Sequence, residues 1–276
     1  MQSNLATRLT TAVLVVPLLV LLLFWGPAWG FYVLVAAATG LAGLELFGMT
    51  DPDDRPSQAL GALSCVAVSA AMYWFDTRQA LLGVLLLTPM LGSLVPLWRL
   101  GAIETAGLRV LAHVAGPFYI GALLCTLALM RRDLGAAGPW FVLLTLTAAW
   151  FGDTGGYFFG RFLGKRKLYP AVSPKKTVAG FVGALVGALA ATLVASFWYL
   201  PGLGVLAAAV LGALAGAGGQ LGDLVESLLK RATGVKDSGA IIPGHGGLLD
   251  RIDAVLFVSP LVYLYALWFG PMAELR

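Results

Sequence analysis

Residues 177–198, TVAGFVGALVGALAATLVASFW, contain no charged side chain and decide the class of fold. A helix that crosses the hydrocarbon core of a bilayer needs about 20 mostly apolar residues, and this stretch has that length and composition. We therefore predict an all-α, polytopic integral membrane helical bundle of about nine transmembrane helices. The other stretches of this kind lie at roughly 8–25, 28–49, 58–75, 79–97, 107–130, 139–159, 202–227 and 253–270.

The composition supports lipid as the solvent of this chain. Of its 276 residues, 59% are hydrophobic and only 12% are charged, whereas soluble domains carry about 25% charged residues. So few ionised groups cannot cover a large water-exposed surface, which argues against a soluble fold. We expect a single membrane domain over 1–276, with N-terminal spans in 1–130 and C-terminal spans in 131–276 that include polar segments at about 151–177 and 220–253.

Positively charged residues favour one orientation in the membrane. No Ala-x-Ala cleavage site follows the first apolar stretch, so we interpret it as a retained helix. With nine spans and a cytoplasmic N-terminus, 14 of the 18 Lys and Arg residues lie on the cytoplasmic side. Cytoplasmic loops carry such an excess. We predict a multi-pass protein of the inner (cytoplasmic) membrane, with both polar segments facing the cytoplasm. The exceptions are Arg78, Arg131, Arg132 and Arg276.

Several polar residues of the N-terminal half are interpreted as structural. Cys65 and Cys125 lie in apolar runs without metal-like spacing, so we expect them to be buried as small hydrophobic residues. Glu45 lies near the end of a predicted span, where it could face the polar site or extend to the cytoplasmic surface, and we favour the second. Arg109 and His113 fall in the first half of the fifth span and suggest an interfacial helix there.

Acidic residues gather around the second polar segment. Asp250 and Asp253 are three positions apart and share one face of a helix, while Asp223 lies near the cytoplasmic end of the preceding span. Carboxylates from two helix ends form an oxygen-rich site of the kind that Mg²⁺ prefers, and no cysteine or paired histidine suggests zinc. The same acids could instead be helix-end charges paired with Arg251 and Lys230.

Glycines surround a histidine in the loop between these acids. Glycine lets the backbone approach a phosphate and present N–H groups to it. His245 could donate a hydrogen bond to a phosphate or leaving group, or it could order the loop. The glycines are Gly239, Gly244, Gly246 and Gly247.

The first polar segment is basic and ends at a predicted helix start. Lys175 and Lys176 belong to Ser-Pro-Lys-Lys-Thr, residues 173–177. Free N–H groups and the helix dipole favour an anion at such a position, so we predict phosphate contacts for both lysines. The basic residues of 161–167 suit a polyphosphate or lipid headgroups, but a cytoplasmic loop without any ligand would also be basic.

The stretch 227–253 resembles the diagnostic pattern of phosphatidate cytidylyltransferases, also called CDP-diacylglycerol synthases. Asp153-Thr-Gly and 173–177 resemble an upstream segment of that family, and residues 1–130 resemble it only as apolar spans. The matching positions are Ser227, Lys230, Arg231, Lys236, Asp237, Pro243, His245, Gly246, Gly247, Asp250, Arg251 and Asp253.

The resemblance implies a reaction of phospholipid biosynthesis. CTP and phosphatidic acid would give CDP-diacylglycerol and pyrophosphate at the cytoplasmic face, with Mg²⁺ as cofactor; the family also allows a second cation. The expected partners are CTP, phosphatidic acid and the bilayer, with no nucleic acid. The glycine-rich later spans are compatible with a homodimer and equally with close packing inside one chain.

The site hypothesis assigns a role to each group of residues. Asp223, Asp250 and Asp253 hold the metal, and together with His245 and Lys176 they form the catalytic set. Asp153 and Asp237 could also be ion-pair partners of neighbouring basic residues. The residues expected to contact substrate are Ser173, Lys175, Lys176, Thr177, Lys230, Arg231, Lys236, Asp237, Gly246, Gly247 and Asp153.

Two other functions remain open from the residues. A CTP-dependent enzyme that acts on an isoprenoid ether lipid phosphate, or a polyprenol kinase, could share much of this layout. An ion-coupled carrier also places acids in glycine-rich helices. The acids here cluster at one membrane face instead of crossing the midplane, which disfavours the carrier.

Overall fold

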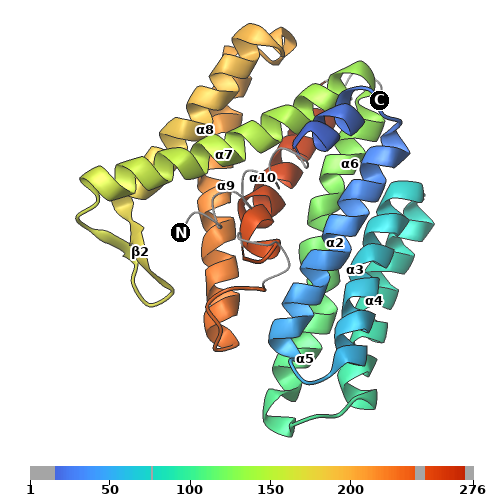
Figure 1. The fold of residues 1–276 in the computed structure, drawn as a ribbon. Helices are drawn as coiled ribbons and strands as arrows, with labels where there is room; N and C mark the ends of the chain where they lie inside the picture. The colour runs from blue at the N-terminus through green and yellow to red at the C-terminus, as the bar shows by residue number, and fades with distance from the viewer. Residues whose placement is uncertain (1–15, 76, 240–245, 271–276) are drawn as a thin grey trace. The chain divides into compact units, whose positions relative to one another are not determined.

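Helices account for most of the residues that the computed structural model describes, which are 16–75, 77–239 and 246–270 (Figure 1). The prediction of an all-α membrane fold is confirmed, with one short β-hairpin as an addition. The α-helices are α2 (Ala28–Thr50), α3 (Arg55–Trp74), α4 (Arg78–Trp98), α5 (Ile103–Gly116), α6 (Leu123–Asp133), α7 (Gly138–Leu163), α8 (Val178–Trp198), α9 (Val205–Ala232) and α10 (Leu249–Trp268).

Seven helical runs among the described residues are long and apolar enough to cross a membrane. The chain is therefore a multi-pass membrane protein. The predicted span 58–75 corresponds to α3, which is not among the seven, and Ser57, Gln58 and Ser69 are buried on it. The predicted span 8–25 lies partly outside the described residues. The seven runs are Ala28–Thr50, Arg78–Trp98, Ile103–Asp133, Gly135–Leu163, Val178–Trp198, Val205–Ala232 and Leu249–Trp268.

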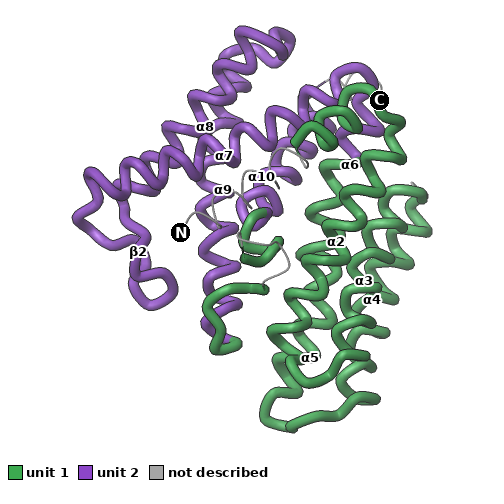
Figure 2. The backbone as a smooth tube through the Cα atoms, viewed as in Figure 1, with its two compact units in different colours: residues 1–128, 233–251 green, residues 129–232, 252–276 purple. Residues whose placement is uncertain are grey.

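The chain divides into two compact units that each combine separate stretches of sequence (Figure 2). One unit contains residues 1–128 and 233–251, and the other contains 129–232 and 252–276. The second polar segment is therefore divided between the two units. Residues 233–251 belong to the unit of the N-terminal helices, and α9 belongs to the unit that contains α7 and α8.

In the first unit, α2 packs closely against α3. A Cβ on Gly61 would lie 2.5 Å from ring atoms of Phe47, which is fully buried, so only a glycine fits at this crossing. Cys65 and Cys125 are also fully buried and form no disulfide, which confirms their interpretation as core residues. The Cys125 thiol donates to the Ser69 carbonyl oxygen at 3.3 Å.

A buried ionic cluster corrects the expectation of an interfacial helix around Arg109 and His113. Helix α5 continues through a π-helical turn, Pro117–Ala122, into α6, so the chain stays helical here. Arg109 and His113 are 4% and 1% exposed. Arg109 Nε lies 2.5 Å from Asp51 Oδ1, and His113 Nε2 lies 3.6 Å from Asp51 Oδ2. The acid in the turn after α2 supplies the counter-charge that lets both side chains be buried.

Asp51 is strongly acidic as a result of these contacts. Burial alone would raise the pKa of its carboxyl, but hydrogen bonds from His113, Arg109 and Thr50 outweigh that effect and hold the pKa at about 2. Asp51 is therefore ionised at neutral pH and balances the charge of Arg109.

In the second unit, glycines let helices α7 and α8 lie side by side (Figure 1). A Cβ on Gly183 would collide with the carbonyl oxygen of Gly155, and a Cβ on Gly187 would collide with that of Phe151. The predicted close approach of glycine-rich helices is thus confirmed. These contacts lie within one chain, so the glycines do not by themselves require a second copy.

A β-hairpin connects α7 to α8 and was not predicted. Strand β1 (Lys167–Tyr169) pairs antiparallel with β2 (Ser173–Thr177). Helix α8 begins directly after β2, as expected, and the Thr177 hydroxyl accepts a hydrogen bond from the Gly180 N–H at 3.1 Å. Thr177 is buried and serves as an N-cap, which fixes the end of β2 against the first turn of α8.

Candidate active site

A close crossing of α9 and α10 brings acidic residues together in the second unit. A Cβ on Gly222 would collide with the carbonyl oxygen of Asp253, so the two backbones nearly touch at this point. Asp223 is the next residue on α9. The glycine therefore sets the short distance between the helix segments that carry Asp223 and Asp253.

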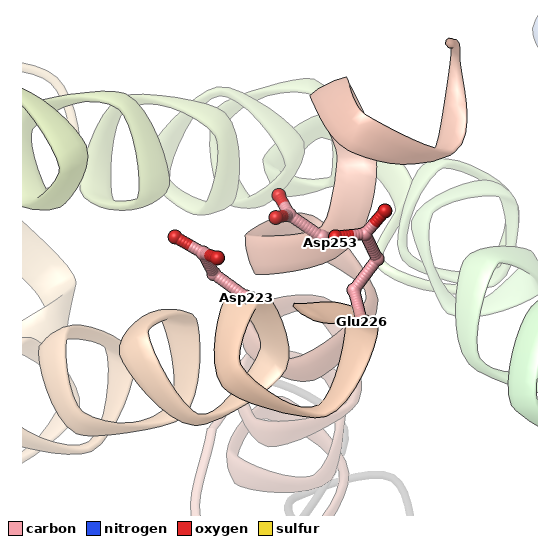
Figure 3. Close-up of side chains that lie close together, drawn as sticks. All are labelled: Asp223, Glu226 and Asp253. Carbon is pink, nitrogen blue, oxygen red and sulfur yellow. The ribbon is translucent and has the colours of Figure 1, made fainter. Parts of the chain in front are cut away.

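Three carboxylates meet at this crossing. Asp223, Glu226 and Asp253 each offer an oxygen, and these oxygens lie within 4.8 Å of one another. Figure 3 shows that two of the side chains come from α9 and the third from α10. Asp223 and Glu226 are three positions apart, so the helix presents both on one face. Asp253 Oδ1 also accepts a hydrogen bond from the Ala254 N–H at 2.7 Å.

Lys176 reaches this group from the hairpin. Its Nζ lies 2.8 Å from Asp223 Oδ2 and donates to the Gln220 carbonyl oxygen at 3.3 Å. On the other side of the same carboxylate, the Ser227 hydroxyl donates to Asp223 Oδ1 at 3.3 Å. Only 14% of the Lys176 side chain is exposed. Strand β2 thus places the ammonium group of Lys176 next to the acidic cluster.

Glu226 is the member of this group that the sequence analysis missed. It is fully buried, and Lys230 Nζ lies 2.5 Å from its Oε2. The available signal was its spacing of three from Asp223. Lys230, which we predicted to contact phosphate, pairs with Glu226 in this structure.

The remaining predicted residues of the second unit lie around the cluster in different environments. Asp153 is exposed on α7 and lies close enough to Asp253 for their charges to interact. Lys175 and Arg231 are exposed, and Ser173 is partly buried. Lys175 and Lys176 therefore differ in their surroundings, since of the two only Lys176 contacts the acidic cluster.

Asp250 belongs to the first unit, where the loop holds it. Its Oδ2 accepts hydrogen bonds from the Ser238 N–H at 3.1 Å, the Ser238 hydroxyl at 3.0 Å and the Gly247 N–H at 3.3 Å. Glu45 lies in the same unit and is 4% exposed. The expectation that Glu45 extends to the surface is wrong, because its carboxylate accepts hydrogen bonds from this loop.

The structure describes the loop between α9 and α10 up to residue 239 and again from residue 246. Lys236 and Asp237 are exposed, and Gly247 is buried. Gly246 has a φ of 84°, a backbone conformation that favours glycine. His245 lies outside the described residues, as do Pro243 and Gly244.

Comparison with known proteins assigns the family. The family model described as "Cytidylyltransferase family" matches residues 6–269. The chain belongs to the cytidylyltransferase family. Two similar proteins are named phosphatidate cytidylyltransferase. The one from Staphylococcus haemolyticus (strain JCSC1435) is 46% identical over 125 residues, which cover 45% of this chain and 48% of the relative. The one from Bacillus subtilis (strain 168) is 46% identical over 140 residues, or 50% and 52%.

The chain spans about half the length of the curated relatives it matches, whereas the family model covers nearly all of it. The cytidylyltransferase assignment therefore includes both the N-terminal helices and the polar C-terminal segments. It agrees with the family that the residues at 227–253 indicate.

The acidic cluster of this cytidylyltransferase has the chemistry of a hard-cation site. Among the residues that the structure describes, its ligand atoms are three carboxylate oxygens, with no thiolate or imidazole. Mg²⁺ prefers oxygen ligands, whereas structural zinc sites use mainly cysteine and histidine. The side chains of Asp223, Glu226 and Asp253 therefore fit a magnesium ion better than a zinc ion.

Proposed function

We propose that the chain is a phosphatidate cytidylyltransferase, which transfers CMP from CTP to phosphatidic acid and releases pyrophosphate. The observation that supports this most is the carboxylate cluster of Asp223, Glu226 and Asp253 with Lys176 beside it, on a membrane-spanning chain of the cytidylyltransferase family. The names of the two relatives point to the same lipid substrate.

The reaction joins two anions. A phosphate oxygen of phosphatidic acid forms a bond to the α-phosphorus of CTP, and the bond from that phosphorus to the pyrophosphate oxygen breaks. The attacking phosphate is already ionised at neutral pH, so the site does not need a strong general base. It needs positive charge near the reacting phosphates and near the leaving pyrophosphate.

Acidic side chains would hold the cation in this scheme. Asp223, Glu226 and Asp253 would bind Mg²⁺, whereas a metal role for Asp250 stays a prediction from the sequence. Bound there, Mg²⁺ would supply positive charge that offsets the repulsion between the two phosphates. A second cation stays a prediction of the family resemblance.

Lys176 would provide charge from the protein itself. Its ammonium group lies 2.8 Å from Asp223, so it is already next to the proposed cation site. When the nucleotide binds, Lys176 would exchange part of this ion pair for a hydrogen bond to a phosphate oxygen. Asp223 would keep the lysine oriented before the substrate arrives.

The orientation of the site is part of the proposal. The excess of Lys and Arg on one side of the predicted spans favours a cytoplasmic site, where CTP is available. The lipid substrate would enter from the inner leaflet and present its phosphate at the same face.

Product analysis tests the proposed function. Purified protein is incubated with labelled CTP and phosphatidic acid, with and without Mg²⁺, and the lipids are identified by mass spectrometry. A diacyl lipid that carries CMP, formed with one pyrophosphate and only with Mg²⁺, is the expected result. Transfer to an isoprenoid ether lipid phosphate or to a polyprenol, but not to phosphatidic acid, would overturn the choice of lipid. Substrate flux in proteoliposomes without consumption of nucleotide would indicate a carrier instead.

A further inference from the structure

A buried carboxylate in the first unit accepts hydrogen bonds from residues of the second polar segment. Glu45 Oε1 accepts a hydrogen bond from the Leu248 N–H at 2.9 Å, and Oε2 accepts one from the Leu249 N–H at 2.7 Å. The Ser238 hydroxyl lies 3.1 Å from Oε2. Glu45 belongs to α2, so these contacts join an N-terminal helix to residues about 200 positions later in the chain.

Glu45 acts as a cap for α10. The first N–H groups of a helix have no partner within the helix and need an acceptor elsewhere. Leu249 is the first residue of α10, and its N–H is one of the two that Glu45 accepts. A negative charge at this end of the helix is also favoured by the helix dipole.

Two glycines of the second polar segment have no room for a side chain: Glu45 occupies the space at Gly239, and Ser238 and Glu45 occupy it at Gly247. A Cβ on Gly239 would lie 2.7 Å from Glu45 Oε1 and 2.9 Å from its Cδ. A Cβ on Gly247 would lie 2.8 Å from Glu45 Oε2 and would collide with Ser238 Oγ. Neither glycine has a positive φ. Space, and not backbone conformation, therefore requires glycine at both positions.

The contacts of Glu45 extend to Asp250 through Ser238. The Ser238 hydroxyl lies 3.1 Å from Glu45 Oε2 and 3.0 Å from Asp250 Oδ2, and it has one proton to donate between them. The Ser238 N–H donates to Asp250 as well. The position of the Asp250 carboxylate thus depends on Ser238, whose hydroxyl also contacts Glu45.

We propose that Glu45 is a positioning residue for the cytidylyltransferase reaction. It fixes the start of α10 and, through Ser238, the carboxylate of Asp250, and its carboxylate occupies space beside Gly239 and Gly247. This inference rests on the proposed function, in which Asp250 belongs to the catalytic set. It gives these glycines a role in packing against α2 instead of a direct approach to phosphate.

Replacement of the carboxylate tests the positioning role. Glu45→Gln keeps the size of the side chain but places an NH₂ group against a backbone N–H. We expect kcat to fall about 10- to 100-fold, as for other residues that orient a catalytic group, with a smaller change in KM for CTP. Hydrogen exchange of the Leu248 and Leu249 amides should become faster without any substrate present. Glu104→Gln, at an exposed position on α5, is the control and should change neither quantity.

A double substitution tests the packing of the loop. Gly239→Ala should lower kcat strongly in the natural chain, because its methyl group meets the anchored carboxylate. In a Glu45→Ala background that carboxylate is absent, so Gly239→Ala should add little further loss. Gly48→Ala is the control: Gly48 lies on α2 with Glu45, and a Cβ there would have no neighbouring atom within 4 Å.

Two results would overturn the inference. One is a Glu45→Gln protein with natural kcat and natural amide protection at Leu248 and Leu249. The other is full additivity of Glu45→Ala and Gly239→Ala. Failure of the proposed function is distinguishable from both: the natural protein would then transfer no CMP to phosphatidic acid, while the amide protection would still report whether Glu45 holds the loop.

Discussion

The ammonium group of Lys176 lies 2.8 Å from the carboxylate of Asp223, and this ion pair joins the β-hairpin to helix α9. The adjacent Lys175 is exposed. Two neighbouring lysines of one motif therefore have different surroundings, and of the two only Lys176 contacts the acidic cluster.

Lys176→Ala should reduce kcat by roughly 100-fold, because it removes a positive charge aimed at the reacting phosphates. Lys176→Arg should recover part of this loss, since the charge returns in a different shape. Lys165→Ala, which changes an exposed lysine before the hairpin, serves as the control. Steady-state rates with CTP and phosphatidic acid give the comparison, and equal rates for Lys176→Ala and the control would contradict the role of Lys176.

Asp223→Asn and Asp253→Asn should each raise the Mg²⁺ concentration needed for half-maximal activity at least about tenfold, because each removes a charged ligand. Glu226→Gln should have a similar effect and would establish the ligand that the sequence analysis missed. Removal of divalent metal with EDTA should abolish turnover, and Mg²⁺ should restore it. Asp53→Asn changes an exposed acid and should leave the Mg²⁺ curve unchanged; a shift of the same size in this variant would indicate a general charge effect.

Gly222→Ala should separate α9 from α10 and lower both activity and thermal stability, since its Cβ would collide with the carbonyl oxygen of Asp253. The matched control is Gly219→Ala, one turn earlier on the same helix. A Cβ there would meet Ala254 at 3.4 Å and Val258 at 3.7 Å, which are ordinary contacts. Midpoints of thermal unfolding and kcat should fall for Gly222→Ala alone. Equal effects of the two substitutions would show that the close crossing does not matter.

Stability should fall in acid because of Asp51. Its pKa lies at about 2, below the ordinary value of 3.8, so the stabilisation is fully present above pH 3.8 and is lost as the pH falls through 2. The shift corresponds to about 2 kcal/mol at neutral pH. Thermal unfolding in detergent between pH 2 and 6 should show a loss of stability that is much smaller in Asp51→Asn. Parallel pH profiles for the two proteins would exclude Asp51 as the source.

The helices could be predicted from the sequence because lipid imposes a simple rule on composition. The predicted span 79–97 corresponds to α4, Arg78–Trp98, and the predicted start near 177 corresponds to α8 at Val178. Apolar length decides such boundaries locally. The hairpin was missed because strands of three and five residues depend on pairing with each other and leave almost no local signal.

The candidate site was only partly predictable for a related reason. Asp223 and Asp253 were recognised from their positions at helix ends, and the structure brings them together. Glu45 was assigned to the surface because its acceptor role depends on Ser238, which is 193 positions away. His113 was misplaced in the same way, since its partner Asp51 lies in a turn that the local pattern does not connect to it. Partners from distant segments decide whether a charge can be buried.

Because both native cysteines are buried, the unmodified protein should give a low background in thiol labelling. Cys65 and Cys125 are its only cysteines and are fully buried, so a membrane-impermeant maleimide should react poorly with the unmodified protein. A single new cysteine at an exposed position then reports its own side of the bilayer. In intact cells, Arg78→Cys should be labelled and Lys165→Cys should be protected until the membrane is opened, which would map the direction of insertion without removing any native residue from the core.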